Sequence, residues 1–483
     1  MDVPVDVPPD NKVQDIQVDR QVNHRALSSA LRKLDLFLLP IATIAYFLNF
    51  LDRSNIGNAK AAGLQTDLKL TNRQYSVALT VTYVPYIVAE LPLTLAMKRV
   101  GPHILIPTLV VSWGLVTLFQ GFVHSYGGLI AARFFLGLTE GAILPGLVTY
   151  LSSFYHRQVL GKRLAFFFSA TSLAGAFSGL LASAILNMEG VSGKRGWQWI
   201  FILEGLLTVV CGAITFFILP RDLSTARYLT IEERDALRLA HEIDGGATAA
   251  HERFSFRHMV QAMKSPQLWM VFAMFFGNGV TLYSLAYFAP TIVQGLGYKG
   301  ISIQLHSVPP YACSAFVAVV ACYMSDRLRH RGSFIVGASI ISIIGYAMFL
   351  GSTNHHTLYG SLFLQVIGAY TMAPLLSTWM PNNLAPYYTR VTGIAFGFIS
   401  TNSGGILSTW LFPTTEAPRY KKATWTAMAL SISIAVLAIM NSIFLAIQNK
   451  NRGTVPIVQE NLEDSVDSLD DLGDKDPRFR YIT

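Results

Sequence analysis

Residues 34–60 read LDLFLLPIATIAYFLNFLDRSNIGNAK, an apolar run long enough to cross a bilayer that carries Asp52 and Arg53 near its outer end. A later apolar segment carries Arg133 and Glu140, which are about two helical turns apart and therefore share one helix face. Each ionisable group at membrane depth costs about 3 kcal/mol or more, so such groups usually face a wet cavity and pair with one another. We therefore favour a functional charge cluster. The alternative is that one or two of these side chains lie at the interface and extend into water.

The composition is that of a multi-pass membrane protein. Of the 483 residues, 52% are hydrophobic and only 14% are charged, whereas a soluble domain carries about 25% charged residues. The formal net charge is +8, but the basic residues form short clusters between apolar runs, which favours a role in topology over nucleic-acid binding. Cys211, Cys313 and Cys322 lie in apolar segments without paired spacing, so we expect buried small hydrophobic residues and no disulfide or metal site.

Runs of about twenty apolar residues predict an all-α polytopic fold with about twelve transmembrane helices in two six-helix halves. The first six are expected at 34–60, 73–98, 103–123, 127–153, 162–187 and 197–219. The second six are expected at 267–290, 305–325, 332–351, 356–379, 386–411 and 423–447. The predicted domains are an N-terminal tail (1–33), a first half (34–219), a central loop (220–266), a second half (267–447) and a C-terminal tail (448–483). This is the layout of two repeated halves that close on a central site.

The loop charges predict the orientation of the chain. Basic clusters at 98–99, 157–163 and 327–331 fall on the same side as both termini and the central loop, whereas the loops at 124–126 and 352–356 carry no Lys or Arg. By the positive-inside rule, both termini are expected to be cytoplasmic. The basic connection at 416–422 would lie on the outer side, as a local exception.

Two polar segments lie outside the expected spans. Thr230 and Glu233 have the spacing of a helix capping box, which predicts an amphipathic helix in the central loop through Leu237 and Ala240. We interpret the central loop as a tether on the membrane surface. The C-terminal stretch 460–476 is acidic and poor in large apolar residues, so we expect it to be disordered and regulatory.

A charged turn follows the eighth expected helix. Residues 325–332 read SDRLRHRG, in which Asp326 precedes Arg327 and Arg331. An acid and spaced basic residues at a cytoplasmic turn can latch neighbouring helices through charged hydrogen bonds and helix-end dipoles. The corresponding first-half turn, residues 98–102 (KRVGP), lacks the acid, and there a purely topological role is equally open.

These turns resemble the loop signature of the major facilitator superfamily. Residues 51–57 (LDRSNIG) with 59–60 resemble the first-helix motif of its anion:cation symporter family, and 133–141 (RFFLGLTEG), continuing to 145–146, resemble the fourth-helix motif. Further stretches resemble the fungal allantoate, nicotinate and vitamin permease branch: 86–92, 199–205, Trp379 with Asn383, and 417–420. The resemblance covers about residues 35–447. Two positions depart from the pattern: Val159 stands where an acid is common, and Pro386 stands where glycine is usual.

The resemblance implies roles for individual residues. Asp52 and Glu140 match the proton-coupling carboxylates of the family. Arg53 and Arg133 match arginines that are associated with the substrate anion or its coupling network. Tyr86 and Asn402 match positions that hydrogen-bond the substrate. Tyr83, one turn from Tyr86, and Asn278 in the seventh expected helix are further substrate-binding candidates. Glu90 and Glu204 match family positions near helix ends, for which we expect a structural role.

The chemistry of the charged residues supports this hypothesis independently. A guanidinium holds a carboxylate in a planar bidentate fork, so an incoming carboxylate competes with the cluster's own acids. A displaced Asp or Glu in a poorly solvated site gains proton affinity, which links substrate binding to protonation.

We therefore predict a proton-coupled symporter of a small organic anion, most simply a monocarboxylate, that is monomeric, needs no cofactor beyond the proton gradient and lies in the plasma membrane. The alternative is a nutrient sensor of the same fold that binds its ligand and signals. The sequence contains no Gly-x-x-x-x-Gly-Lys-Ser/Thr, His-Glu-x-x-His or Gly-x-Ser-x-Gly element, which argues against an ATP-driven pump and against an enzyme.

Overall fold

The computed structural model describes residues 23–243, 265–384, 387–413, 416, 419–452 and 481–482. Within these residues the regular structure is entirely helical. The long elements of the first half are α1 (His24–Ala61), α3 (Asn72–Val100), α4 (Pro102–Gln120), α5 (Tyr126–Glu140) with α6 (Ile143–Phe154), α7 (Arg157–Ile185) and α8 (Gly196–Ile218). Those of the second half are α12 (Pro266–Gly295), α13 (Ile301–Leu328), α14 (Arg331–Gly351), α15 (His355–Asn382), α16 (Tyr387–Ser408) and α17 (Lys421–Arg452).

Ten of these elements, with α5 and α6 taken as one, are long and apolar enough to cross a membrane. The helices α3 and α16, which have 29 and 22 residues, complete the set of twelve. The expected all-α polytopic fold is therefore confirmed. The main difference is in the fourth expected helix, 127–153, which is divided between α5 and α6.

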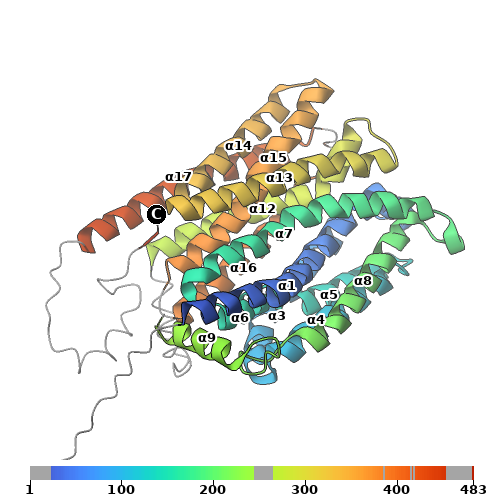
Figure 1. Ribbon diagram of the computed structural model, residues 1–483. Helices are drawn as coiled ribbons and strands as arrows, with labels where there is room; N and C mark the ends of the chain where they lie inside the picture. The colour runs from blue at the N-terminus through green and yellow to red at the C-terminus, as the bar shows by residue number, and fades with distance from the viewer. Residues whose placement is uncertain are drawn as a thin grey trace, which may run out of the picture.

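The two halves use the same helix pairings. In the first half α1 packs against α7, α3 against α5, and α4 against α8. In the second half α12 packs against α16, α13 against α15, and α14 against α17. Since these pairs occupy equivalent positions in the order of long helices, the two halves are built as repeats. Figure 1 shows them side by side, the first in blue to green and the second in yellow to red.

The halves meet along α1 with α12, α7 with α13, and α3 with α16. Glycines allow the close approach at the first two junctions. A Cβ on Gly57 of α1 would lie 2.5 Å from the carbonyl oxygen of Tyr287 on α12, and one on Gly179 of α7 would lie 3.0 Å from the carbonyl oxygen of Gln304 on α13. Such close backbone contact is typical of membrane helices, whose association depends on packing and not on a hydrophobic effect between them.

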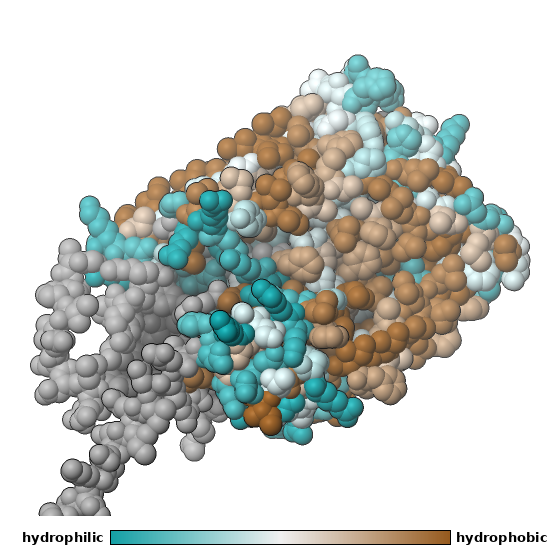
Figure 2. Space-filling model, viewed as in Figure 1, coloured by the Kyte–Doolittle hydropathy of each residue, from teal (hydrophilic) through white to brown (hydrophobic). Residues whose placement is uncertain are grey.

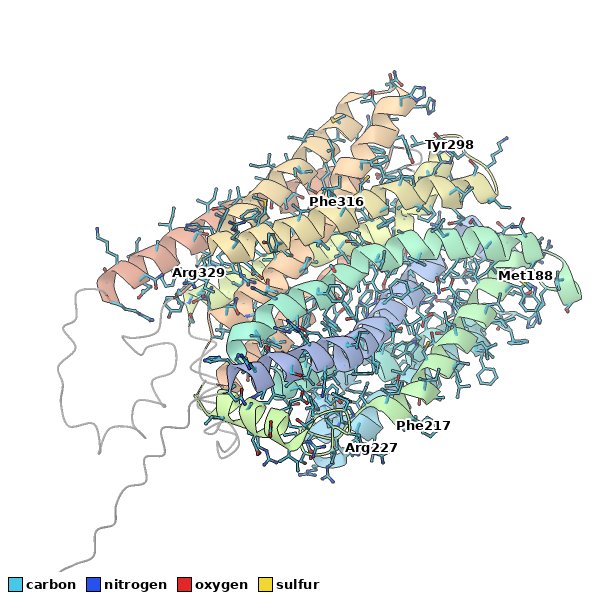
Figure 3. The ribbon with its side chains drawn as sticks, viewed as in Figure 1. Met188, Phe217, Arg227, Tyr298, Phe316 and Arg329 are labelled. Carbon is cyan, nitrogen blue, oxygen red and sulfur yellow. The ribbon has the colours of Figure 1, made fainter. Side chains whose placement is uncertain are left out.

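The outer surface of the bundle is apolar. Phe217 on α8 and Phe316 on α13 are 91% and 73% exposed (Figure 3). Figure 2 shows hydrophobic residues over the middle of the visible face and hydrophilic residues gathered towards its ends. In a bilayer, lipid tails cover such a surface, so these side chains are in a favourable environment.

The three cysteines are all free, as the sequence predicts. The expectation that each is a buried small hydrophobic residue holds for Cys322 only. Cys211 is half-buried and Cys313 is exposed. The reason is that an apolar helix in this fold has a lipid-facing side as well as a core-facing one, and the sequence pattern does not separate the two.

The predicted helix of the central loop is α9 (Ile231–Ile243), and its capping box is confirmed. The backbone N–H of Thr230 donates to Glu233 at 2.9 Å, and that of Glu233 donates to the Thr230 hydroxyl at 3.3 Å. The same carboxylate accepts hydrogen bonds from Ser29 at 2.7 Å and Lys33 at 2.9 Å, which dock α9 on α1.

Two opposing effects set the charge state of Glu233. Burial raises its pKa, but the hydrogen bonds from Lys33, Ser29 and the Thr230 backbone outweigh this and lower the pKa to about 2. Because the pKa is below the ordinary value, the stabilisation is fully present above about pH 4.5 and is lost as the pH falls towards 2. The docked position of α9 is therefore insensitive to pH in the physiological range.

Three sequence features lie outside the described residues: the acidic stretch 460–476, Pro386, and the pair Ala417–Pro418. The positive-inside orientation and the membrane-surface position of the central loop stay predictions.

The α1–α12 junction yields a first prediction. Gly57→Ala places a methyl group against the carbonyl of Tyr287, so the helices must separate, and we expect a loss of stability of about 1–3 kcal/mol. Thermal unfolding of the detergent-solubilised protein measures it. Gly337→Ala on α14 is the matched control, because a Cβ there meets nothing within 4 Å. Equal melting temperatures for the two variants would contradict this account of the junction.

Candidate functional site

The four charged residues singled out in the sequence are all buried inside the bundle. Asp52 and Arg53 on α1 are 2% and 8% exposed, and Arg133 and Glu140 on α5 are 3% and 1% exposed. None of them extends into water from a helix end. The structure therefore favours a charge cluster over charges that lie at the interface.

Glu140 is positioned by a break in the fourth spanning element. It is the last residue of α5, and α6 begins at Ile143. Pro145 has no N–H with which to bond the carbonyl of Gly141 four residues earlier, which accounts for the interruption. A Cβ on Gly141 would lie 2.5 Å from the carbonyl oxygen of Tyr86, so the glycine lets α3 approach. The break and the glycine together bring Glu140 close to the residues of α1 and α3.

Arg53 is the best-bonded member of the cluster. Its Nη2 lies 3.5 Å from Oε2 of Glu140, and its Nη1 donates a hydrogen bond to the hydroxyl of Tyr283 on α12. The guanidinium lies 5.0 Å from the ring centroids of both Tyr86 and Tyr283, which is cation–π geometry. The Tyr283 hydroxyl in turn donates to Oδ1 of Asn402 on α16 at 3.2 Å. A polar chain from Glu140 to Asn402 therefore joins the two halves through Arg53.

Arg133 is held much less firmly. Its Nε and Nη2 have no hydrogen-bond partner among the described residues, although the side chain is buried. It lies 5.8 Å from the ring centroid of Phe201 and interacts electrostatically with Glu140 and Asp52. A buried guanidinium with unused donors is costly unless an acceptor arrives. Arg133 is therefore the cation of the cluster that is available to an anion.

Asp52 does not pair with an arginine within the described part of the chain, contrary to the expected pairing of two acids with two arginines. It accepts hydrogen bonds from Trp113 Nε1 at 2.5 Å, Thr117 Oγ1 at 3.4 Å and Asn55 Nδ2 at 3.3 Å. The reason is geometric: successive residues on a helix point about 100° apart, so Asp52 faces α4 while Arg53 faces α12.

Asn55 joins Asp52 to a second acid. Its Nδ2 also donates to Oε2 of Glu204 on α8, so one amide bridges two buried carboxyl groups. Oε1 of Glu204 has no hydrogen-bond partner in the described residues. The prediction that Glu204 lies near a helix end is wrong. Glu204 lies in the interior of α8, which runs from Gly196 to Ile218.

Glu90 is also a member of the cluster and not a helix-end residue. It lies within α3, 1% exposed, with neither carboxyl oxygen hydrogen-bonded to a described residue, and it interacts electrostatically with Arg53. Its signal in the sequence is the one that identified Asp52 and Glu140, an acid inside an apolar run. Its match to a family position near a helix end pointed instead to a structural role.

The hydroxyls of Tyr83 and Tyr287 are hydrogen-bonded at 2.5 Å across the junction of α3 with α12. Tyr83 therefore lies beside the cluster, and its substrate-binding role stays a prediction; Tyr287 is a contact that sequence reasoning missed. The spacing of four residues between Tyr283 and Tyr287 places both on one face of α12 and was an available signal. Asn278 instead donates to the carbonyl of Ala369 at 2.9 Å, a bond between α12 and α15, and no contact places it at the cluster.

The predicted latch residues are only partly brought together. Arg331 Nη2 donates to Asp326 Oδ1 at 2.5 Å, and this pair joins α13 to α14. Arg331 also lies 3.6 Å from the position of a Cβ on Gly161 of α7, at the border with the first half. Arg327 is exposed and has no such contact among the described residues. A gating role for these three residues stays a prediction.

Contacts between the halves are found on both sides of the cluster along the bundle. Towards the side of the N-terminus, the rings of Phe168 on α7 and Phe398 on α16 are 6.1 Å apart. Towards the other side, Lys60 on α1 lies 4.9 Å from the ring centroid of Phe288 on α12. Side chains of the two halves therefore meet on either side of the cluster.

The chain is similar to known membrane transporters. The model of the Major Facilitator Superfamily matches residues 42–409. An uncharacterised transporter of Schizosaccharomyces pombe is 37% identical over 94% of this chain and 90% of its own length. The high-affinity nicotinic acid transporter of Saccharomyces cerevisiae is 29% identical over 95% of this chain and 86% of its own length.

Two solved structures share the fold. A bacterial homologue of the human lysosomal transporter Spinster, inward-facing and unoccupied, has a TM-score of 0.66 at 14% identity, over 90% of this chain and all of that one. A D-xylose–proton symporter has a TM-score of 0.64 at 14% identity, over 84% of this chain and 96% of that one.

The polar chain between the halves yields a second prediction. Tyr283→Phe removes the hydroxyl that joins Arg53 to Asn402, and leaves a buried guanidinium donor unpaired. We expect a destabilisation of about 1.5–3 kcal/mol, measured by thermal unfolding of the purified protein. The control is Tyr323→Phe on α13, whose side chain is 66% exposed. If Tyr283→Phe melted together with this control, the hydroxyl would not link the halves.

Proposed function

The chain belongs to the major facilitator superfamily and is a multi-pass membrane transporter, and we propose that it couples proton entry to the uptake of a small organic anion. The observation that carries this proposal is the buried guanidinium of Arg133, whose Nε and Nη2 have no hydrogen-bond partner in the described residues. A carboxylate binds such a guanidinium through two parallel hydrogen bonds. The other arginine, Arg53, already has Glu140 and Tyr283 as partners. The anion is therefore assigned to Arg133.

Charge balance supports the coupling to protons. Four carboxyl groups, those of Asp52, Glu90, Glu140 and Glu204, share the buried cluster with two guanidinium groups. A buried net charge is very costly, so a neutral cluster requires two of the four carboxyl groups to carry a proton. A bound monoanion adds one negative charge, which one further proton balances. Anion and proton therefore bind together, as symport requires.

Alternating access is supported by the contacts on both sides of the cluster. Three kinds of contact cross between the halves near the cluster. They are the hydrogen bond from Arg53 to Tyr283, the ring contact of Phe168 with Phe398, and the close backbone approach at Gly57. Rocking of the two halves breaks one set of contacts at a time, and so opens the cluster to one side while the other stays closed.

We propose a monocarboxylate as the substrate. The relative from S. cerevisiae is a nicotinic acid transporter, and nicotinate-like acids, other vitamins and allantoate are the candidates. Tyr86, Tyr83 and Asn402 border the cluster and would hydrogen-bond or stack on the part of the substrate beyond its carboxylate. The driving force is the proton gradient, without a cofactor, and the site of action is the plasma membrane with both termini cytoplasmic.

A sensor of the same fold is the second candidate, and one assay separates the two. Cells that lack their own nicotinate uptake and express this chain receive radiolabelled nicotinate and related acids, with a step to acidic external pH. A symporter accumulates one of the acids, and faster after the step. Binding without accumulation of any acid would overturn the transport proposal.

Glu140 yields a third prediction. Glu140→Gln removes a titratable group next to Arg53 while it keeps the side-chain shape. We expect the accumulation ratio of the substrate to fall to about one, because uptake is no longer tied to protons, while exchange of labelled for unlabelled substrate continues. Uptake and exchange are measured in the same vesicles. Glu232→Gln on the exposed side of α9 is the control. Normal accumulation by Glu140→Gln would remove Glu140 from the coupling mechanism.

Arg133 yields a fourth prediction. Arg133→Lys keeps the charge but loses the planar fork, so we expect the affinity for the carboxylate to fall by about tenfold or more. The affinity is measured as the concentration of substrate that half-saturates binding to the purified protein. Arg238→Lys on α9, an exposed position, is the matched control. An unchanged affinity in Arg133→Lys would show that the anion binds elsewhere.

A further inference from the structure

A second polar site lies at the C-terminal ends of α15 and α17, away from the charge cluster. Trp379 and Asn383, which the sequence resemblance had singled out, lie at the end of α15 and are each 1% exposed. Asn449 and Arg452 lie in the last turn of α17. The transport mechanism uses none of these four side chains.

Asn383 and Trp379 bind the backbone of Ile482. Asn383 Oδ1 accepts a hydrogen bond from the Ile482 N–H at 2.8 Å, and its Nδ2 donates to the Ile482 carbonyl at 2.9 Å. The indole Nε1 of Trp379 donates to the same carbonyl at 2.8 Å. Both polar groups of the Ile482 backbone are thereby satisfied by α15.

Asn449 binds the backbone of Tyr481, the residue before Ile482, in the same way. Its Oδ1 accepts from the Tyr481 N–H at 2.9 Å and its Nδ2 donates to the Tyr481 carbonyl at 2.9 Å. Arg452 donates to the Tyr481 hydroxyl at 2.9 Å and lies 4.4 Å from the centre of its ring. The Tyr481 ring also packs against the main apolar core. Tyr481 is therefore held by both its backbone and its side chain.

We propose that the ends of α15 and α17 form a docking site for an extended peptide, and that the chain's own residues Tyr481 and Ile482 occupy it. A carboxamide offers one donor and one acceptor, as a backbone peptide group does, so each asparagine pairs with one residue as a neighbouring strand would. Asn449 and Asn383, on two different helices, bind two successive residues, which fixes the register of the peptide in the site. Arg452 then selects an aromatic residue at the first of the two positions.

The docked residues brace two helices of the moving half. Tyr481 is held by α17 and Ile482 by α15, so the peptide ties the ends of these helices together. Asn382, next to Asn383, has its Oδ1 4.0 Å from the position of a Cβ on Gly161 of α7, in the other half. The docking site therefore borders the place where the halves must separate on this side, and release of the peptide frees the end of α15.

Hydrogen–deuterium exchange of the full-length protein in detergent tests the proposal without knowledge of the substrate. We expect the amides of Tyr481 and Ile482 to exchange at least about tenfold more slowly than in a free peptide of residues 474–483, because both N–H groups are donors to asparagine. The double variant Asn383→Ala, Asn449→Ala should exchange at the free-peptide rate. The matched control Asn382→Ala, which lacks these bonds to the tail, should keep the protection.

A competition arm covers the case in which the double variant fails to fold, which loss of protection in α12 would reveal. An excess of acetylated peptide 474–483 added to the wild-type protein should raise the exchange of Tyr481 and Ile482, and the same peptide with Tyr481→Ala should not. Free-peptide exchange of these amides in the wild-type protein would overturn the proposal. Full protection in a folded double variant, or protection untouched by the competing peptide, would do the same.

Discussion

The requirement that charge buried in the bilayer be neutralised governs the structure around Arg53. An isolated guanidinium at this depth costs about 3 kcal/mol or more, and the ion pair with Glu140 and the hydrogen bond to Tyr283 offset this cost for Arg53. Other features serve this arrangement. The break before Ile143 brings Glu140 into place, Gly141 lets α3 approach, and Gly57 lets α12 come close enough to present its tyrosines. The glycines and the proline of these helices are thus part of the charge cluster's architecture.

The division of polar groups between the halves is unequal. Among the described residues, the acidic and basic side chains buried in the interior of the spans all belong to the first half: Asp52, Arg53, Glu90, Arg133, Glu140 and Glu204. The second half contributes neutral partners, the tyrosines of α12 and Asn402. Because the Arg53–Glu140 ion pair lies within one half, the proposed movement of the halves breaks hydrogen bonds to neutral groups and leaves this ion pair intact. This keeps the free-energy difference between the conformations small, which a transporter that cycles between them requires.

The sequence was sufficient to predict the helices and four charged residues of the cluster, Asp52, Arg53, Arg133 and Glu140, but not the other two acids or the pairings. Lengths of apolar runs locate most span ends to within about five residues because the bilayer thickness sets them, but α1 begins at His24, well before the expected residue 34. The division at Gly141–Ala142 was missed although Pro145 signals it, since apolarity continues through the break. The partners of Asp52 lie on α1, α4 and, through Asn55, on α8, and no spacing along the chain reports a neighbour on another helix. Trp379 carries a family motif, yet its role depends on Ile482, about a hundred residues away, so no local pattern could reveal it.

The placement of the charges in the first half also bears on how the chain is made. Membrane helices enter the bilayer in order from the N-terminus, and each charged residue must find a partner or water as it does so. Arg53 lies on α1 and its partner Glu140 on α5, so the ion pair cannot form until α5 has been made. Once α8 has followed, every acid and both arginines of the cluster are present, before α12 exists. The Arg53–Glu140 pair is therefore relevant both to membrane insertion of the chain and to the proposed transport cycle.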